Sequence, residues 1–107
     1  MAQIVWTEPA LSDLEAIADY IALDNPAAAQ KLVRRVFEYV DQLEAFPDSG
    51  SKPPELKGWA YRQIVEPPCR VFYRHERHVV YILHVIRSEQ RLRRTRLTRP
   101  EAGKNES

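Results

Sequence analysis

Residues 61–87 constrain the fold of this chain more than any other stretch. They read YRQIVEPPCRVFYRHERHVVYILHVIR and contain three runs of strand-forming residues. Pro67-Pro68 separates the first two runs, and the polar pair Glu76-Arg77 separates the last two. Proline cannot donate a ladder hydrogen bond, so such breaks indicate turns. The stretch therefore predicts a three-stranded antiparallel sheet, with strands at about 59–66, 69–75 and 78–86.

The residues before this sheet predict a short strand and a helical hairpin. Gln3 to Thr7 has a strand pattern, and Thr7 is a candidate helix N-cap with Pro9 in the first turn. Asn25-Pro26 is the corresponding start of a second helix. Apolar residues at spacings of three and four form one stripe on each helix: Leu11, Leu14, Ala18 and Ile21, then Ala29, Leu32, Val33, Val36, Val40 and Leu43. Because these apolar stripes must be buried against a sheet, we expect an α+β fold.

The length of 107 residues fits a single small domain. Residues 47–58 are rich in Pro, Gly and Ser and predict a loop. Residues 88–99 are compatible with a short basic helix, and the polar residues from Pro100 predict a frayed tail. We therefore expect one domain over 1–99 and a tail over 100–107.

Composition excludes several classes of protein. No run of about 20 apolar residues is present, so no membrane span is predicted. The N-terminus lacks the basic and apolar regions of a secretion signal. The single cysteine, Cys69, cannot form an internal disulfide, which fits a reducing compartment. No His-Asn or His-Asp arrangement accompanies it, so Cys69 is predicted to be a small packing residue.

Charge is distributed unevenly although the net charge is only +1. Residues 1–50 hold nine acidic and three basic residues, and residues 51–107 hold six acidic and thirteen basic residues, giving net charges of −6 and +7. The halves either neutralise each other within the fold or present a bipolar surface to an oriented partner. Guanidinium groups on the predicted sheet are suited to carboxylate or phosphate, and the residues that carry them are Arg62, Arg70, Arg74 and Arg87.

More arginines follow the last predicted strand, among them Arg91, Arg93 and Arg94. If residues 88–99 are helical, four pairs of like charges become neighbours, at a total cost of roughly 1–2 kcal/mol. We therefore expect this segment to be marginally stable alone and to be ordered by an acidic surface on a partner. The pair His75 and His78 has the spacing of metal ligands but lacks further ligands nearby, so no metal and no cofactor is expected.

The order of elements resembles the ParE/RelE superfamily of toxin–antitoxin toxins over roughly residues 3 to 95. The segments that carry the resemblance are TEPALSDLEAIADYI, FPDSG at 46–50, PEL at 54–56 before YR at 61–62, RVFYR at 70–74, and the apolar strand 79–86 that ends at Arg87. The resemblance implies a cytoplasmic bacterial growth inhibitor that a cognate antitoxin neutralises. RelE-like members look like ribosome-dependent mRNA endonucleases, and ParE-like members look like inhibitors of DNA gyrase.

Residue chemistry favours the ParE-like branch. RNA cleavage by the 2′-hydroxyl needs a general base, a general acid and a charge stabiliser, for which Arg62, Arg87, Tyr61 and Tyr73 would be the candidates. After the last strand the chain reads RSEQR, without the Tyr or His that RelE-like chains often place there, and arginine stays protonated. His84 is expected on the face opposite Arg87, together with Ile82 and Ile86. We therefore predict a gyrase inhibitor without catalytic residues.

Two alternatives stay open: a RelE-like mRNA endonuclease, and a member that has lost toxicity and only binds its antitoxin. The expected partners are the antitoxin, in a hetero-oligomer, and gyrase with or without its DNA. An antitoxin segment that folds on binding could add a helix across the hairpin or a strand to a sheet edge. Its candidate contacts are the sheet arginines and the apolar residues Leu11, Leu14, Ile21, Leu32 and Val36, which are equally consistent with core positions.

Overall fold

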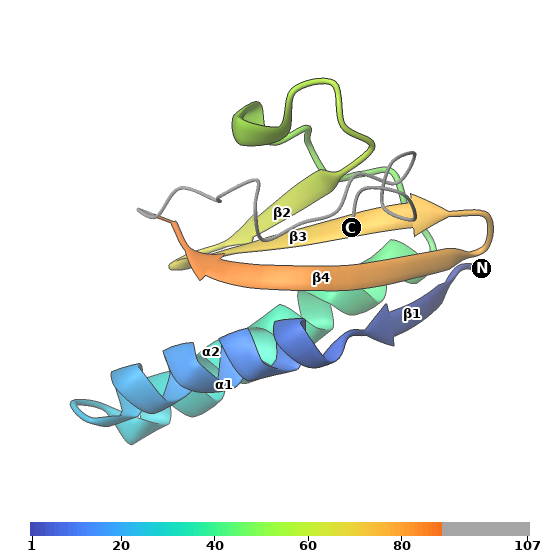
Figure 1. Ribbon diagram of the computed structural model, residues 1–107. Helices are drawn as coiled ribbons and strands as arrows, with labels where there is room; N and C mark the ends of the chain where they lie inside the picture. The colour runs from blue at the N-terminus through green and yellow to red at the C-terminus, as the bar shows by residue number, and fades with distance from the viewer. Residues whose placement is uncertain (89–107) are drawn as a thin grey trace.

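A computed structural model describes residues 1–88 of the chain (Figure 1). A short strand is followed by two helices, a loop with two 3-10 turns, and three further strands. These elements are β1 (Gln3–Trp6), α1 (Glu8–Ala22), α2 (Pro26–Asp41), η1 (Gln42–Glu44), η2 (Pro54–Leu56), β2 (Arg62–Glu66), β3 (Cys69–Glu76) and β4 (Val79–Arg87). The predicted basic helix over 88–99, with its arginines, and the predicted tail lie outside the described residues.

The strands form one mixed sheet in the order β1-β4-β3-β2. β2, β3 and β4 are consecutive antiparallel neighbours, and β1 pairs in parallel with β4. The predicted α+β class, with an N-terminal strand, a helical hairpin and three antiparallel strands, is confirmed. The sequence did not predict that the first strand joins the sheet beside the last.

Side-chain caps and prolines define where both helices begin. Thr7 Oγ1 and Asn25 Oδ1 each accept a hydrogen bond from the amide three residues later, at 3.4 and 3.1 Å. Pro9 and Pro26 occupy the first turns, where a missing N–H costs nothing. Within residues 1–88, no helix is long and apolar enough to cross a bilayer.

The helical hairpin covers one face of the sheet (Figure 1). The apolar stripes of both helices meet strand residues in the main core, which includes Leu14, Leu32, Val36, Val40, Ile64, Val71, Val80, Ile82 and Val85. Cys69 is fully buried in the same cluster, as predicted for a small packing residue. The stripes read from the sequence therefore mark the layer that faces the sheet.

A second, smaller core lies on the opposite face of the sheet. Leu56, Trp59 and Tyr61, from the segment before β2, pack with Phe72 and Ile86. Successive side chains of a strand point to opposite faces, so this cluster lies away from the helices. β4 is thus central and covered on both faces, which explains its nearly continuous apolar sequence.

A β-bulge in β4 changes which of its residues share a face. Two consecutive residues of β3 pair with Ile82 and His84, so Leu83 is the extra residue. Ile82 therefore belongs to the helix-side core, whereas Ile86 packs on the opposite face. The prediction that Ile82, His84 and Ile86 share one face is wrong for Ile82, because simple alternation fails across a bulge. His84 does lie on the face opposite Arg87, as predicted.

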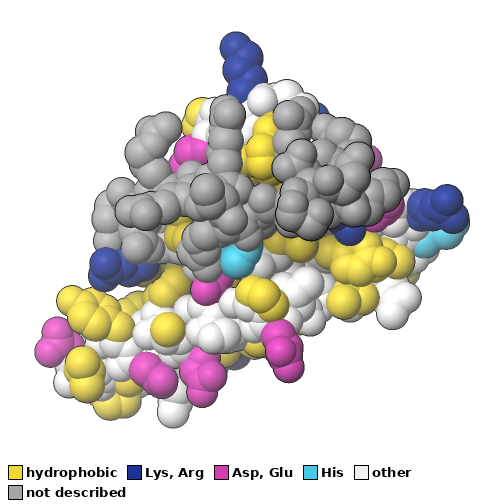
Figure 2. Space-filling view, viewed as in Figure 1, with side chains coloured by type: hydrophobic (Ala, Val, Ile, Leu, Met, Phe, Trp, Pro, Cys, Tyr) yellow, Lys and Arg dark blue, Asp and Glu magenta, His cyan; other side chains and the backbone are white. Residues whose placement is uncertain are grey.

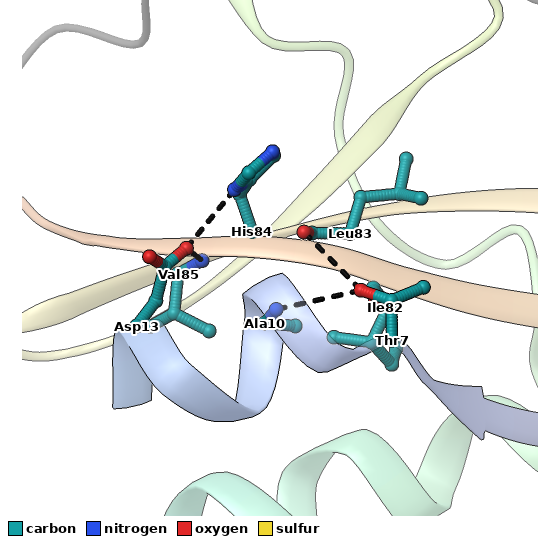
Figure 3. A network of polar contacts seen from close by, with 7 residues as sticks. All are labelled: Thr7, Ala10, Asp13, Ile82, Leu83, His84 and Val85. Atoms are coloured by element: carbon teal, nitrogen blue, oxygen red, sulfur yellow. Dashed lines mark hydrogen bonds and ion pairs between the residues drawn. The ribbon is translucent and has the colours of Figure 1, made fainter. Parts of the chain in front are cut away.

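Beyond the end of β1, α1 closes the edge of β4 (Figure 3). The Thr7 hydroxyl donates to the carbonyl oxygen of Ile82 at 2.6 Å. Six residues later, one carboxylate oxygen of Asp13 accepts the Val85 amide at 3.0 Å and lies 3.0 Å from Nδ1 of His84. A buried backbone donor needs a partner. Asp13 therefore replaces the carbonyl oxygen that a longer β1 would have supplied.

We predict that Asp13→Ala lowers the free energy of unfolding by about 1–3 kcal/mol, because the Val85 amide loses its acceptor. The control is Asp19→Ala, an exposed aspartate of the same helix, expected to change stability by less than about 0.5 kcal/mol. Urea unfolding followed by circular dichroism measures both variants. Equal losses of unfolding free energy in the two variants would show that the contacts of Asp13 make no specific contribution to stability.

Candidate functional site

The arginines of the strands do not form one surface. Arg70 and Arg74 lie on the face away from the helices, in the same row of β3 as Phe72. Arg62 and Arg87 lie on the helix side, one at the start of β2 and the other at the end of β4. The alternation of the strands therefore divides the four arginines between two faces of the sheet.

The guanidinium group of Arg70 makes its contacts within the protein. Its two terminal nitrogens lie 2.7 Å from the two carboxylate oxygens of Glu55, and Nε donates to Oε1 of Gln63 at 2.9 Å. Both charged side chains are nearly buried, with exposed fractions of 11% and 6%. The guanidinium carbon also lies 4.9 Å from the ring centroid of Phe72. Arg70 thus anchors η2 to the sheet, and its charge is directed inward.

Arg74 is more accessible than Arg70. Its guanidinium carbon lies 5.1 Å from the ring centroid of Tyr81, and its Nη2 lies 3.1 Å from Oε1 of Glu76. The side chain keeps 25% of its surface exposed. Its Nε atom is buried and has no hydrogen-bond partner among residues 1–88. Among the arginines on the face away from the helices, Arg74 is therefore the better candidate to meet an external anion.

Arg62 belongs to a polar cluster that fixes the loop before β2. Its Nη1 donates to the carbonyl oxygen of Gly50 at 2.8 Å, and its Nε lies 3.7 Å from Oδ1 of Asp48. Nδ1 of His75 lies 2.9 Å from the same oxygen of Asp48. His75, on β3, thereby holds this loop against the sheet. Within residues 1–88, no group of three or more His, Cys, Asp or Glu side chains is arranged to hold a metal ion.

Gly50 allows the loop to approach the sheet closely. Its amide donates to the hydroxyl oxygen of Tyr73 at 2.9 Å. A Cβ atom on Gly50 would lie 2.6 Å from the carbonyl oxygen of Gln63 and 2.7 Å from that hydroxyl. Burial raises the pKa of Tyr73 above its usual value of 10.0. The Tyr73 hydroxyl is thus a buried structural acceptor.

Arg87 meets the helical hairpin at the end of β4. Its guanidinium carbon lies 5.3 Å from the ring centroid of Tyr20 on α1, a contact that is worth about 0.5–1 kcal/mol at an exposed site. Tyr20 is 63% exposed, and Leu23, in the turn between the helices, is 82% exposed. This end of the molecule therefore combines a cation with accessible apolar side chains.

The four candidate residues for RNA cleavage are not all brought to one site. In the register of the sheet, Arg62 of β2 lies opposite Tyr73 of β3, whereas Arg87 of β4 lies opposite Cys69, the first residue of β3. Tyr61 belongs to the core on the opposite face of the sheet. The two tyrosines are 1% and 0% exposed. No acid–base pair among these residues is therefore presented at one accessible phosphate site.

The helix residues proposed as antitoxin contacts divide into core and surface. Leu14, Leu32 and Val36 are at most 6% exposed and belong to the main core. Leu11 is 42% exposed, and Ile21 is partly buried. An antitoxin can therefore reach Leu11 without rearranging the core, but not Leu14 or Val36. A shallow apolar groove between the helices is lined by Ala18, Asp19, Ala22, Pro26, Ala29, Gln30, Val33 and Arg34.

The unequal charges of the two halves are partly neutralised and partly exposed. Asp48 lies beside Arg62 and His75, so some charges pair across the halves. Acidic side chains are also spaced along the helical layer (Figure 2), and Glu8, Glu15 and Asp19 of α1 are exposed. Some charges of the two halves are therefore neutralised within the fold, and acidic side chains of the first half remain exposed.

Sequence reasoning missed three acidic residues that organise the fold: Asp13, Asp48 and Glu55. Their partners lie 72, 27 and 15 residues further along the chain. No local periodicity signals such contacts. Glu55 offered one hint, because a lone acid between proline and leucine, close to a predicted arginine-rich sheet, has the chemistry of a buried pair.

Comparison with known sequences decides the family. The family described as "ParE toxin of type II toxin-antitoxin system, parDE" matches residues 4–92, most of the chain. This chain belongs to the ParE toxin family. The resemblance to ParE/RelE toxins is thereby confirmed, and membership of a toxin–antitoxin family implies a cognate antitoxin as partner.

Relatives of this ParE-family chain match it over most of their own length. Toxin RelE2 of Caulobacter vibrioides is 37% identical over 86 residues, which cover 79% of this chain and 93% of that protein. Putative toxin Y4kP of Sinorhizobium fredii is 36% identical over 88 residues, covering 82% and 90%. A solved structure of the chromosomal ParDE TA system from P. aeruginosa has 30% identity and a TM-score of 0.69, covering 83% of this chain and 98% of that one.

The pKa of Asp48 lies below its usual value of 3.8, and we predict that His75→Ala raises it toward that value. The hydrogen bond from His75 is the largest cause, partial burial opposes it, and the charges of His75, Arg62 and Lys52 lower the pKa further. Because the folded-state pKa is depressed, the carboxylate stabilises the fold above about pH 4, and this contribution is lost as the pH falls through the folded-state pKa.

A carbon-detected NMR titration of the Asp48 carboxyl group measures this shift. The matched control is His78→Ala, an exposed histidine of the adjacent hairpin turn, which is expected to leave the midpoint unchanged. A midpoint for Asp48 that is the same in His75→Ala and in the unmodified chain would contradict the prediction.

We predict that Glu55→Ala lowers the free energy of unfolding by about 3–5 kcal/mol, because it leaves the nearly buried Arg70 without its carboxylate. Replacing both partners, as Glu55→Leu with Arg70→Met, should recover most of this loss, since no buried charge then remains. Glu66→Ala on β2 is the control, expected to have a much smaller effect. Urea unfolding of the three variants measures these differences, and a double variant no more stable than Glu55→Ala would count against the explanation.

Proposed function

We propose that this ParE-family chain is a toxin that acts in the bacterial cytoplasm, binds DNA gyrase and blocks DNA replication until its antitoxin neutralises it. The observation that carries the proposal is that Arg62, Arg87, Tyr61 and Tyr73 do not converge on one accessible site, although Arg62 and Tyr73 are neighbours. A general acid or base must come within about 2.6–3.2 Å of the proton that it transfers. Both tyrosines are buried, on opposite faces of the sheet, which supports binding rather than cutting.

The state of Tyr73 strengthens this argument. Its hydroxyl oxygen accepts the Gly50 amide, and burial raises its pKa. A phenol with a raised pKa is ionised to a smaller fraction at neutral pH, so less of it can act as a general base, and an effective general base has a pKa near the pH of the reaction. To serve in RNA cleavage, Tyr73 would first have to lose its contact with the loop that covers it.

The contacts that we propose for gyrase are basic and come from both faces of the sheet. Arg74, on the face away from the helices, and Arg87, on the helix side, provide cations on the described strands, and Arg91, Arg93 and Arg94 extend the basic sequence beyond the described residues. Arg62 and Arg70 are proposed as supports, because their guanidinium groups bind the loop and Glu55. The antitoxin is proposed to contact Leu11, the groove between the helices and the basic end of the sheet.

Two assays run in parallel test the target. Purified toxin in excess over gyrase should inhibit DNA supercoiling, and adding the antitoxin should restore it. The same preparation should leave mRNA uncut on translating ribosomes. Cleaved mRNA with normal supercoiling would replace the proposal with a RelE-like endonuclease, a function favoured by the name of the relative Toxin RelE2. Normal growth after induction without antitoxin would indicate a member that has lost toxicity.

We predict that Arg91→Glu, Arg93→Glu and Arg94→Glu together weaken inhibition of supercoiling at least tenfold, because they reverse the charge of the proposed contact. Lys104→Glu is the matched control, a charge reversal in the polar tail that should leave inhibition unchanged. The concentration of toxin that halves supercoiling measures both variants. If the triple variant inhibits as well as the unmodified toxin, these arginines do not contact gyrase.

A further inference from the structure

A pocket of about 310 Å³ lies where the helical hairpin meets the turn between β2 and β3. Three elements build it: the end of α1, the first half of α2 and the Pro67-Pro68 turn. Apolar and cationic side chains line it together: Ile21, Ala28, Lys31, Leu32, Arg35, Pro67 and Pro68. It is distinct from the groove between the helices and from the polar cluster around Arg62.

The two cations of the pocket lie on one face of α2. Lys31 and Arg35 are one helical turn apart and exposed, and like charges at this spacing repel each other. Neither makes an ion pair or a side-chain hydrogen bond with another residue in the part of the chain that the structure describes. A carboxylate placed between them would relieve this repulsion.

The end of β4 adds a third cation to the same side of the molecule. The Ser88 amide donates to the carbonyl oxygen of Pro68 at 2.7 Å, so β4 ends against the turn that forms the pocket wall. Arg87 precedes this contact and stacks over Tyr20, the neighbour of Ile21 in α1. The apolar floor is therefore flanked by positive charge from α2 and from β4.

We infer that this pocket receives an acidic segment of the antitoxin, with an apolar side chain on the floor and carboxylates at Lys31 and Arg35. The inference rests on the antitoxin partnership of the ParE family and is independent of gyrase as the target. A peptide fits better than a nucleic acid backbone, because a phosphate chain makes no use of a floor built from Ile21 and Leu32. The chemistry required is an aliphatic residue between glutamates or aspartates.

Two model peptides test the pocket without the antitoxin. The probes are blocked pentapeptides, one with leucine between pairs of glutamates and one with leucine between pairs of glutamines, added to the full chain. Methyl NMR signals of Ile21 and Leu32 should shift and saturate with the acidic peptide, and the affinity should fall as salt is added. Equal shifts with the glutamine peptide would overturn the inference. Methyl shifts that grow with protein concentration when no peptide is present would show that a second copy of the chain occupies the pocket instead.

Charge reversal then tests the antitoxin itself. Lys31→Glu with Arg35→Glu should weaken antitoxin binding at least tenfold and reduce its salt dependence, measured by calorimetry. Lys57→Glu is the control, because Lys57 is an exposed cation of the loop before β2 that lines neither this pocket nor the groove between the helices. Thermal unfolding confirms that each variant is folded. Equal weakening by the control would overturn the inference, whereas a failure to inhibit gyrase would leave this result unaffected.

Discussion

The carboxylate of Asp13 is the contact on which the two-layer arrangement depends. It satisfies the Val85 amide at the point where β1 has ended, and it also meets the ring of His84. This fixes the direction in which α1 crosses the sheet, and α2 follows because the two helices pack together. The groove between the helices and the basic pocket at the β2–β3 turn exist only while the hairpin is held in this position.

The segment before β2 depends on a different pair of anchors, one on each face of the sheet. Gly50 brings the loop onto Tyr73, and Glu55 binds Arg70 with two short contacts. These two contacts hold the segment before β2 against the sheet, which this segment covers only in part. The second face of the sheet is thereby covered with few apolar residues. Polar contacts hold this cover in place, where a second layer of helices would otherwise be packed.

The sequence predicted most of the fold but less of the site. Periodicity and the caps at Thr7 and Asn25 located both helices, and Pro67-Pro68 located the turn between two strands. The face of the sheet on which each strand residue lies was harder to assign, because the bulge at Leu83 reverses the alternation within β4. Acids such as Glu55 gave almost no signal, since their partners lie far along the chain and are chosen by packing. The arginines were found, but their division between two faces follows from strand register that local patterns do not fix.

The position of β4 has a consequence for how the toxin is made. β4 is the last described strand to be synthesised, yet it lies between β1, the first strand, and β3. Until residues 79–85 have been added to the chain, β1 has no strand to pair with and Asp13 has no amide hydrogen bond to accept. The sheet that joins β1 to the arginine-bearing strands is therefore completed only by β4, and a chain truncated within β4 would lack a platform for either the antitoxin or the target.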